Sequence, residues 1–347
     1  MKLVTPRANV GARIDLPPIR APHSQPIDEH ALRLPVDGNE RVGSQRGGIP
    51  RVELHRAKVE VSLPREWQMA VAQYAATQIK THFSYDRPNG VASGTLHKLN
   101  DVLSYKILNG FADNLDPGRE FLTQEVIDGW QQRFGDKFDD VLKSGDLRIV
   151  FALYNDYRQI VAGRLNWCLE QLQKPFDLEA EDTLRIPKND TWSRDTASLD
   201  VQWLKRMKLR VIDDVLSGKD VAESHKKFAA ELADVELRPS FSRDEERVSE
   251  WGFDAFMNGY FGSLDRFSRY VPPSEMNRME ARSRGSFSGI GCTISIKYEP
   301  DASGVYKRQV KLGSVTEGGP AERAGVRAGD RLISIRDHAT DELTVLE

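Results

Sequence analysis

Long apolar runs are missing from this sequence of 347 residues, and that absence limits what the protein can be. A membrane-spanning helix needs about 20 consecutive apolar residues, and no stretch approaches that length. The N-terminus also lacks the apolar core of a secretory signal peptide. Because 29% of the residues are charged, we expect a soluble chain of two or three domains without a membrane span.

Cysteine and net charge are scarce as well. The two cysteines, Cys168 and Cys292, are too few for a disulfide framework, and we expect each to be a small buried apolar residue. The 52 acidic and 49 basic residues leave a net charge of only -3. Nucleic acid is therefore not an expected partner, because binding to phosphates requires clustered positive charge.

The common signatures of catalytic and metal sites are also absent. The seven histidines form no i,i+4 pair and have no cysteine partner, which disfavours a zinc site. The sequence contains no P-loop and no Gly-x-Ser-x-Gly turn, and Gly289 with Gly291 lacks the third glycine of a dinucleotide-binding fold. We therefore expect no catalytic residue, no metal and no cofactor in this chain.

Aromatic residues are absent before Trp67, and seven prolines occupy the first fifty positions. A segment of this composition buries too little apolar surface to offset the entropy lost on ordering. We expect residues 1–62 to form an extended or disordered arm. A start codon assigned too far upstream would produce the same composition, so both interpretations stay open.

From residue 63 to residue 264 the apolar residues recur with the period of an α-helix, which predicts a helical domain. No repeat of fixed length is evident, so an α-solenoid is the weaker alternative. Ser242 and Glu245 have the spacing of a capping box that opens the last helix. An aromatic run begins in this helix, and its helical spacing favours a packed core over a ligand site. The run consists of Trp251, Phe253, Phe256, Tyr260, Phe261, Phe267 and Tyr270. The marker residues of the expected helices are Trp67, Val71 and Tyr74, then Leu96 to Ile107, then Val126, Trp130, Phe134 and Phe138, then Leu147 to Leu169, then Val201 to Val215, then Val221 to Leu232, and finally Val248, Trp251, Ala255 and Tyr260.

Glycine turns replace the helical period near the C-terminus. Pro320 predicts the start of a short helix, and Gly325 suits the left-handed cap that ends it. Gly329 predicts a further turn before a β-branched strand around Ile333. About thirty residues before that short helix, a glycine loop precedes another expected strand over residues 292–296.

This combination of a glycine loop, a strand and a short Pro-initiated helix is typical of a PDZ domain. In such a domain the loop offers backbone N–H groups to the terminal carboxylate of a peptide, and the following strand accepts the peptide as an added strand. The expected partners are therefore the C-terminal tails of other proteins. The expected peptide-binding residues are Ser288, Gly289, Ile290, Gly291, Cys292, Thr293 and Ile294.

Several motifs together resemble the tail-specific proteases, also called C-terminal processing peptidases. The lead-in to the PDZ domain and parts of the helical region carry the resemblance, which covers roughly residues 78–337. Members of the family commonly have Asp-Pro-His before the Tyr of this lead-in, whereas Arg266 and Phe267 follow Asp265 here. The matching residues are Asp265, Tyr270, Pro272 and Glu275 in the lead-in, and Leu115-Asp116, Phe121-Leu122, Leu153-Tyr154-Asn155 and Lys174-Pro175-Phe176 in the helical region.

The resemblance implies a mainly α N-terminal helical domain followed by a small, truncated, β-rich PDZ-like domain. The expected segments are an arm at 1–62, the helical domain at 63–264, a linker at 265–284 and the partial PDZ domain at 285–347. The family hydrolyses proteins selected by apolar tails, using a serine that a lysine activates in a later domain. No such dyad is expected in these residues, so we expect that this chain alone does not cleave.

The resemblance also implies a location in the bacterial periplasm or cell envelope, and an adaptor protein that docks on the helical domain is a possible partner. A different class of function stays open, namely a PDZ adaptor or docking protein without catalytic activity. An inactive remnant of a protease gene is a third interpretation. A serine and a lysine further along the reading frame would favour the protease.

Overall fold

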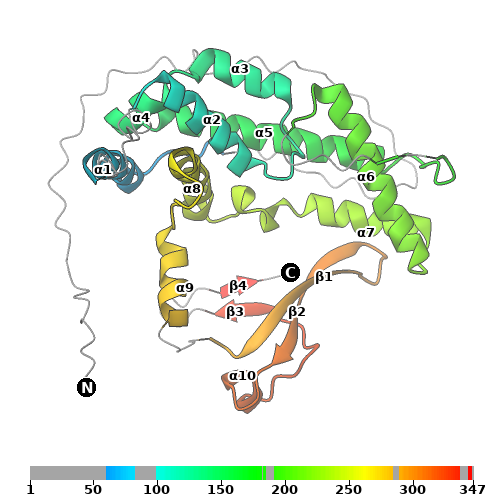
Figure 1. The fold of residues 1–347 in the computed structure, drawn as a ribbon. Coiled ribbons are helices and arrows are strands. Elements are labelled where there is room, and N and C mark those ends of the chain that lie inside the picture. Colours follow the sequence, from blue (N-terminus) through cyan, green and yellow to red (C-terminus); the bar gives the residue numbers. More distant parts are fainter. Residues whose placement is uncertain are drawn as a thin grey trace, which may run out of the picture. The chain divides into compact units, whose positions relative to one another are not determined.

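The computed structural model describes residues 60–82, 99–181, 183–184, 191–283, 289–336 and 343–345. Helices fill most of the described chain up to residue 283, and a small β region follows (Figure 1). This order confirms the predicted fold class, a mainly α region followed by a small β-rich region. The longer helices are α1 (Glu66–His82), α2 (Asp101–Leu115), α3 (Gln124–Phe134), α4 (Phe138–Ser144), α5 (Arg148–Gln171), α6 (Thr196–Leu216), α7 (Val221–Ala233), α8 (Glu245–Leu264) and α9 (Pro273–Ser283).

The remaining elements are short helices and four strands. Two 3₁₀ turns, η2 (Val235–Leu237) and η3 (Pro239–Phe241), connect α7 to α8, and α10 (Pro320–Arg323) is the short helix predicted at Pro320. Strands β1 (Cys292–Pro300) and β2 (Tyr306–Val315) form an antiparallel hairpin. Strands β3 (Ser334–Arg336) and β4 (Leu343–Val345) form a second antiparallel pair.

The helical core is built from large side chains that solvent does not reach. Tyr154 on α5, Phe111 on α2 and Phe256 on α8 are among the largest of them. Helices α2 and α8 come close because Gly110 and Gly259 face each other, and a Cβ atom added to Gly259 would lie 2.6 Å from the Phe111 backbone nitrogen. Only glycine permits so close an approach of two helix backbones.

Two stretches that carried the family resemblance have structural roles in this core. The buried carboxylate of Asp116 accepts hydrogen bonds from the backbone N–H groups of Glu120, Phe121 and Leu122, which shapes the turn after α2. The Tyr154 hydroxyl donates to the Val248 carbonyl oxygen at 2.9 Å and so ties α5 to α8. These groups satisfy polar atoms that burial would otherwise leave unpaired.

The predicted aromatic core holds for most of its members but not for all. Phe253, Phe256 and Tyr260 are buried in α8, as their spacing predicted. Phe267 is 81% exposed, so the prediction was wrong there. The helix ends at Leu264, and beyond that residue helical spacing no longer determines which side faces the core.

The third expected helix is in fact two helices. The period of Val126, Trp130, Phe134 and Phe138 predicted one segment, but α3 ends at Phe134 and α4 begins at Phe138. A Cβ atom at Gly135 would lie 2.2 Å from the Tyr105 ring, and the Phe138 N–H donates to the buried Ser104 hydroxyl. Packing of the break against α2 therefore overrides the local helical period.

The predicted capping box at Ser242 and Glu245 is wrong. The N-cap of α8 is Asp244, whose carboxylate accepts from the N–H groups of Glu246 and Arg247 at 3.0 and 3.2 Å. Ser242 instead ends η3, and its hydroxyl accepts from the Asp244 N–H. An Asp side chain directly before the helix reaches these N–H groups as well as Ser would, and its charge favours the helix N-terminus.

The arm and the linker are only partly covered by the described residues. Residues 1–59 lie outside them, so the expected arm stays a prediction there. Ser62 at its end exchanges two hydrogen bonds with Asn155 on α5, since its N–H donates to the Asn155 Oδ1 atom and its carbonyl oxygen accepts from Nδ2. Within the expected linker at residues 265–284, the structure contains helix α9.

Candidate functional site

The loop before β1 is shaped by glycine. Gly291 has a φ angle of +77°, in the left-handed region that glycine adopts readily and other residues rarely enter. A Cβ atom at this position would also lie 3.1 Å from the Pro320 Cδ atom at the start of α10. The sequence therefore needs glycine at 291 both for the turn and for the contact with α10.

Two hydrogen bonds fix the direction of the peptide groups in this loop. The Ile290 carbonyl oxygen accepts from the Ala321 N–H at 2.8 Å, and the Gly291 carbonyl oxygen accepts from the Thr316 N–H at 2.7 Å. In a trans peptide group the N–H points opposite to the C=O. The N–H groups of Gly291 and Cys292 are therefore directed away from α10 and from β2, and consecutive N–H groups of this kind can bind an anion.

One edge of β1 remains open among the residues that the structure describes. The other edge pairs with β2, from Cys292 opposite Val315 to Pro300 opposite Tyr306. The far edge of β2 is occupied, because its Leu312 N–H donates to the Asp330 carbonyl oxygen and its Val310 carbonyl oxygen accepts from the Leu332 N–H. The hairpin can thus receive a further strand beside β1 but not beside β2 over this stretch.

One face of the hairpin is apolar, and its side chains are buried along β2 but partly exposed along β1. Ile294 and Ile296 lie opposite Leu312 and Val310 on one face of the hairpin. The two β2 side chains are buried, whereas Ile294 is 54% exposed and Ile290 in the loop is 53% exposed. Exposed isoleucines beside an open strand edge and a loop of N–H donors offer apolar contacts to the end of an added peptide.

The seven expected peptide-binding residues are placed as follows. Ser288 lies outside the described residues, and Gly289, Ile290 and Gly291 form the loop. Cys292 is half-buried at the start of β1, not fully buried as predicted, whereas Cys168 in α5 is buried as predicted. Thr293 lies at an irregularity of the β1 and β2 register, where its Oγ1 atom accepts from the Ser314 N–H at 2.8 Å. Its hydroxyl therefore supports the hairpin.

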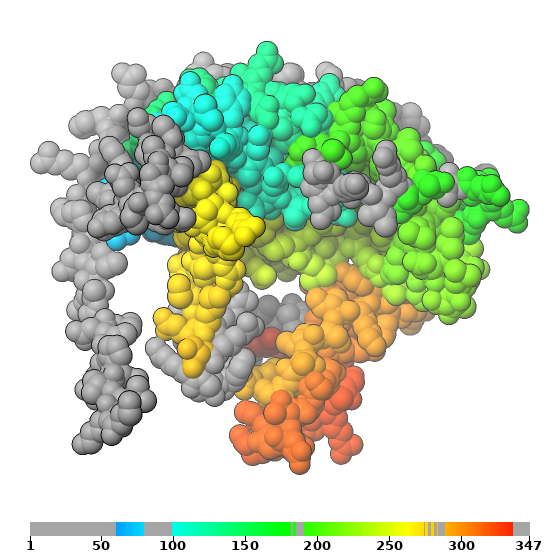
Figure 2. All heavy atoms as spheres, in the orientation of Figure 1, coloured from blue at the N-terminus to red at the C-terminus, as the bar shows by residue number. Residues whose placement is uncertain are grey.

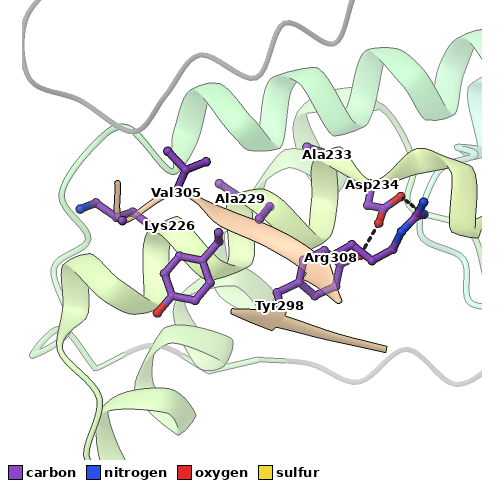
Figure 3. A pocket seen from close by; sticks show the side chains of 10 residues that line it. Lys226, Ala229, Ala233, Asp234, Tyr298, Val305 and Arg308 are labelled. Atoms are coloured by element: carbon purple, nitrogen blue, oxygen red, sulfur yellow. Dashed lines mark hydrogen bonds and ion pairs between the residues drawn. The ribbon is translucent and has the colours of Figure 1, made fainter. Parts of the chain in front are cut away.

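The contact between the far end of the hairpin and α7 was not foreseen from the sequence. The Tyr298 hydroxyl donates to the Asp234 carboxylate at 2.8 Å, and the Arg308 guanidinium donates to its other oxygen at 3.0 Å (Figure 3). The Tyr306 hydroxyl donates to the Glu223 carboxylate at 2.7 Å. In Figure 2 the orange surface of the hairpin meets the yellow-green surface of α7.

A cavity of about 370 Å³ lies at this contact. Figure 3 shows Ala229 and Ala233 of α7 on one side and Tyr298 of β1 on the other, with Lys226 extending away at the rim. Burial, and then the hydrogen bond to Asp234, raise the pKa of Tyr298. Burial, and then the Glu223 carboxylate, raise the pKa of Tyr306 to about 12, so both hydroxyls remain donors at neutral pH.

The described residues contain neither a metal-ligating cluster nor a long apolar helix. No group of three or more His, Cys, Asp or Glu side chains in that part of the chain could hold a metal ion. No helix there is long and apolar enough to cross a membrane.

Comparisons with known proteins agree with the two-part organisation. The family model of the tail specific protease N-terminal domain matches residues 95–274, which is about half of the chain. A PDZ domain model matches residues 312–345. The helical match begins close to α2 and ends within α9, and the PDZ match begins within β2.

Individual relatives are also peptidases. The chain is 26% identical over 240 residues to the tail-specific protease of Haemophilus influenzae, covering 69% of this chain and 32% of that protein. It is 32% identical over 83 residues to the chloroplastic carboxyl-terminal-processing peptidase 2 of Arabidopsis thaliana, covering 24% of this chain and 16% of that protein. The chain thus spans a third or less of these relatives. With half of its length matched by the N-terminal domain model, the chain belongs to the tail-specific protease family.

Proposed function

We propose that this chain is the substrate-recognition portion of a serine-type protease that selects proteins by their apolar C-terminal tails. The observation that carries the proposal is the combination of the Gly291 loop with the open edge of β1. The loop directs two backbone N–H groups away from the hairpin, and the edge of β1 continues directly from that loop. A terminal carboxylate at the loop would place the preceding residues of the tail alongside β1.

The energetics favour a tail with a free carboxylate. Each main-chain hydrogen bond of an added strand contributes about 0.5 to 1.5 kcal/mol, and a hydrogen bond to a charged group contributes about 1.5 to 3 kcal/mol. The exposed Ile290 and Ile294 side chains lie next to the carboxylate position and would pack against an apolar last residue. In this proposal, apolar contacts determine which last residue of the tail is preferred. The N–H groups of the loop require that the tail ends in a free carboxylate.

For the intact protein we propose peptide-bond hydrolysis by a serine nucleophile that a lysine activates as general base. The helical region would act as a platform for recognition, and the PDZ domain would present the bound tail to that dyad. We further propose a bacterial protein of the periplasm or cell envelope. These proposals rest on membership of the family and on the names of its peptidase relatives.

Calorimetry with short peptides tests the recognition step. A five-residue peptide with an apolar end should bind the chain, and the same peptide with an amidated C-terminus should bind about tenfold more weakly or not at all. Equal affinities for the free and the amidated peptide would sink the proposal, because the loop would then have no role.

A matched pair of glycine variants tests the same loop from the protein side. Gly291→Ala introduces a Cβ atom against Pro320 at a φ angle of +77°, and we expect about a tenfold loss of affinity. Gly325→Ala introduces the same kind of strain at a φ angle of +79°, in open space beyond α10, and should keep the affinity. A similar loss in both variants would assign the effect to general destabilisation and not to the loop.

A further inference from the structure

The side of α7 that faces the hairpin carries three small residues and one lysine. Lys226, Ala229, Ala230 and Ala233 recur at the i, i+3, i+4 and i+7 positions and all line the cavity of about 370 Å³. Three alanines in such a stripe leave room that larger side chains would fill. A volume of this size falls at the lower end of the range typical of ligand sites.

Hydrogen bonds hold the opposite wall of the cavity in place. Tyr298 and Arg308 both donate to Asp234, and Tyr306 donates to Glu223, so these tyrosine rings are fixed beside the cavity. The two carboxylates are already engaged by these donors. The interior is therefore lined mainly by alanine methyl groups and tyrosine rings, which favour an apolar or aromatic side chain over a charged one.

The direction of an added strand brings the upstream part of a tail toward this cavity. With its carboxylate at the Gly291 loop, a tail would run antiparallel to β1, so that its upstream residues lie toward Pro300 and its last residue lies beside Cys292. Tyr298 lies six positions after Cys292, which corresponds to about 20 Å along a strand. A tail residue roughly six positions before the carboxylate would thus lie opposite Tyr298.

The alternation of side chains decides which way that residue points. Ile294, Ile296 and Tyr298 share one face of β1, because side chains of a strand alternate with a period of two. Tyr298 on this face reaches Asp234 directly after α7. Residues directly opposite each other in antiparallel strands share a face, so the tail residue opposite Tyr298 points to the α7 side.

We propose that the alanine face of α7 forms an upstream subsite, which takes an apolar or aromatic side chain about six residues before the C-terminus of the tail. The inference rests on the proposed binding of tails to the loop and β1. It adds that the helical region selects substrates as well as carrying the PDZ domain. Tails of five residues end before this subsite, whereas tails of nine residues reach it.

The test compares two tails on three forms of the full chain by calorimetry. The tails share their last five residues, and the longer one has nine residues with a leucine six positions before the last. Ala233→Leu fills the cavity, whereas Ala222→Leu adds the same side chain at an exposed position of α7 that does not line it. Circular dichroism checks that both variants keep their helices.

We expect the nine-residue tail to bind the unmodified chain about tenfold more tightly than the five-residue tail. Part of this gain comes from the main-chain hydrogen bonds of the longer strand, and the rest comes from the upstream leucine. The part that comes from the leucine should be lost in Ala233→Leu and kept in Ala222→Leu. A nine-residue tail with glycine in place of that leucine keeps the main-chain hydrogen bonds, so it should bind the unmodified chain more weakly than the leucine tail, which keeps the test decisive if Ala233→Leu does not fold.

Two failures can be told apart. If the five-residue tail does not bind at all, the proposed function itself is overturned. If it binds but the nine-residue tail gains nothing, or gains equally in Ala233→Leu, the loop remains a tail site and the α7 subsite is overturned.

Discussion

The helical region and the β region bury their apolar side chains to very different degrees. In α2, α5 and α8 the large side chains Phe111, Tyr154 and Phe256 are fully buried. In the described part of the β region, only Val310, Leu312 and Ala321 are buried apolar residues. The isoleucines at 290, 294, 296, 333 and 335 are each about half exposed there.

The two regions are stabilised by different interactions. Burial of large apolar side chains is the main favourable contribution to folding, so the helical region carries its own stability. The β region depends more on backbone hydrogen bonds, on left-handed glycine turns and on its contact with α7. The exposed isoleucines, which contribute little to its stability, include the side chains that we propose contact the tail.

The largest expected effect tests the comparison directly by truncating one side chain in each region. Phe256 packs against the rings of Phe111 and Phe138, and Phe256→Ala should destabilise the protein by about 3 to 5 kcal/mol. Ile294 is half exposed, and Ile294→Ala should change stability by no more than about 0.5 kcal/mol. Denaturant unfolding followed by circular dichroism measures both.

Similar losses of stability in Phe256→Ala and Ile294→Ala would contradict the proposed difference between the two regions. A large cost for Ile294→Ala would mean that this side chain is covered in solution. A small cost for Phe256→Ala would mean that the helical region does not depend on its α2 and α8 contact.

A smaller effect is expected where the backbones of α2 and α8 meet. Gly259→Ala places a Cβ atom 2.6 Å from the Phe111 backbone nitrogen, and overpacking of this kind costs about 1 to 3 kcal/mol. Gly262→Ala lies three residues later on the same helix, with nothing within 4 Å of the added atom. That control should be neutral or stabilise by up to about 1 kcal/mol.

Thermal unfolding of the two variants separates close approach from helix propensity. Stabilisation by Gly259→Ala would contradict the close packing of α2 on α8. Destabilisation by Gly262→Ala to the same extent would assign both effects to the helix itself.

Much of the fold follows from local sequence patterns. The helical period located most helices, because each buries one face in the same core. Pro320 and Gly325 predicted the bounds of α10, since their allowed φ angles leave few alternatives. A glycine turn before β1 was likewise predicted, and the structure adds that Gly291 in this turn has a left-handed φ angle.

The failures involve contacts between residues distant in sequence. The break at Gly135 involves Tyr105, thirty positions earlier, whose ring leaves no room for a Cβ atom at that position. The hydrogen bond from Tyr298 to Asp234 joins residues 64 positions apart. For the same reason the sequence indicated the glycine loop before β1 but not the cavity beside α7, whose walls come from two regions.

The last and smallest effect concerns Asp254 on α8, whose charged neighbours include Glu275 of α9. Burial, and then the nearby carboxylates of Glu250 on α8 and Glu275 on α9, raise its pKa to about 7. Its Oδ1 atom is buried and has no hydrogen-bond partner among the described residues. The folded state therefore holds a proton that the unfolded state, with an ordinary pKa of 3.8, has lost.

The sign of the pH dependence follows from this difference. Between about pH 4 and pH 7 the folded state binds more protons than the unfolded state, so stability falls as the pH rises through that window. Solvent reaches part of the side chain, and screening should keep the effect below that of the core variants. Asp254→Asn should flatten the fall in melting temperature, and Glu250→Gln should shift its midpoint to lower pH. The opposite outcome is a melting temperature that rises from pH 4 to pH 7 and no longer rises in Asp254→Asn. It would show that folding stabilises the ionised carboxylate of Asp254 and would contradict a raised pKa.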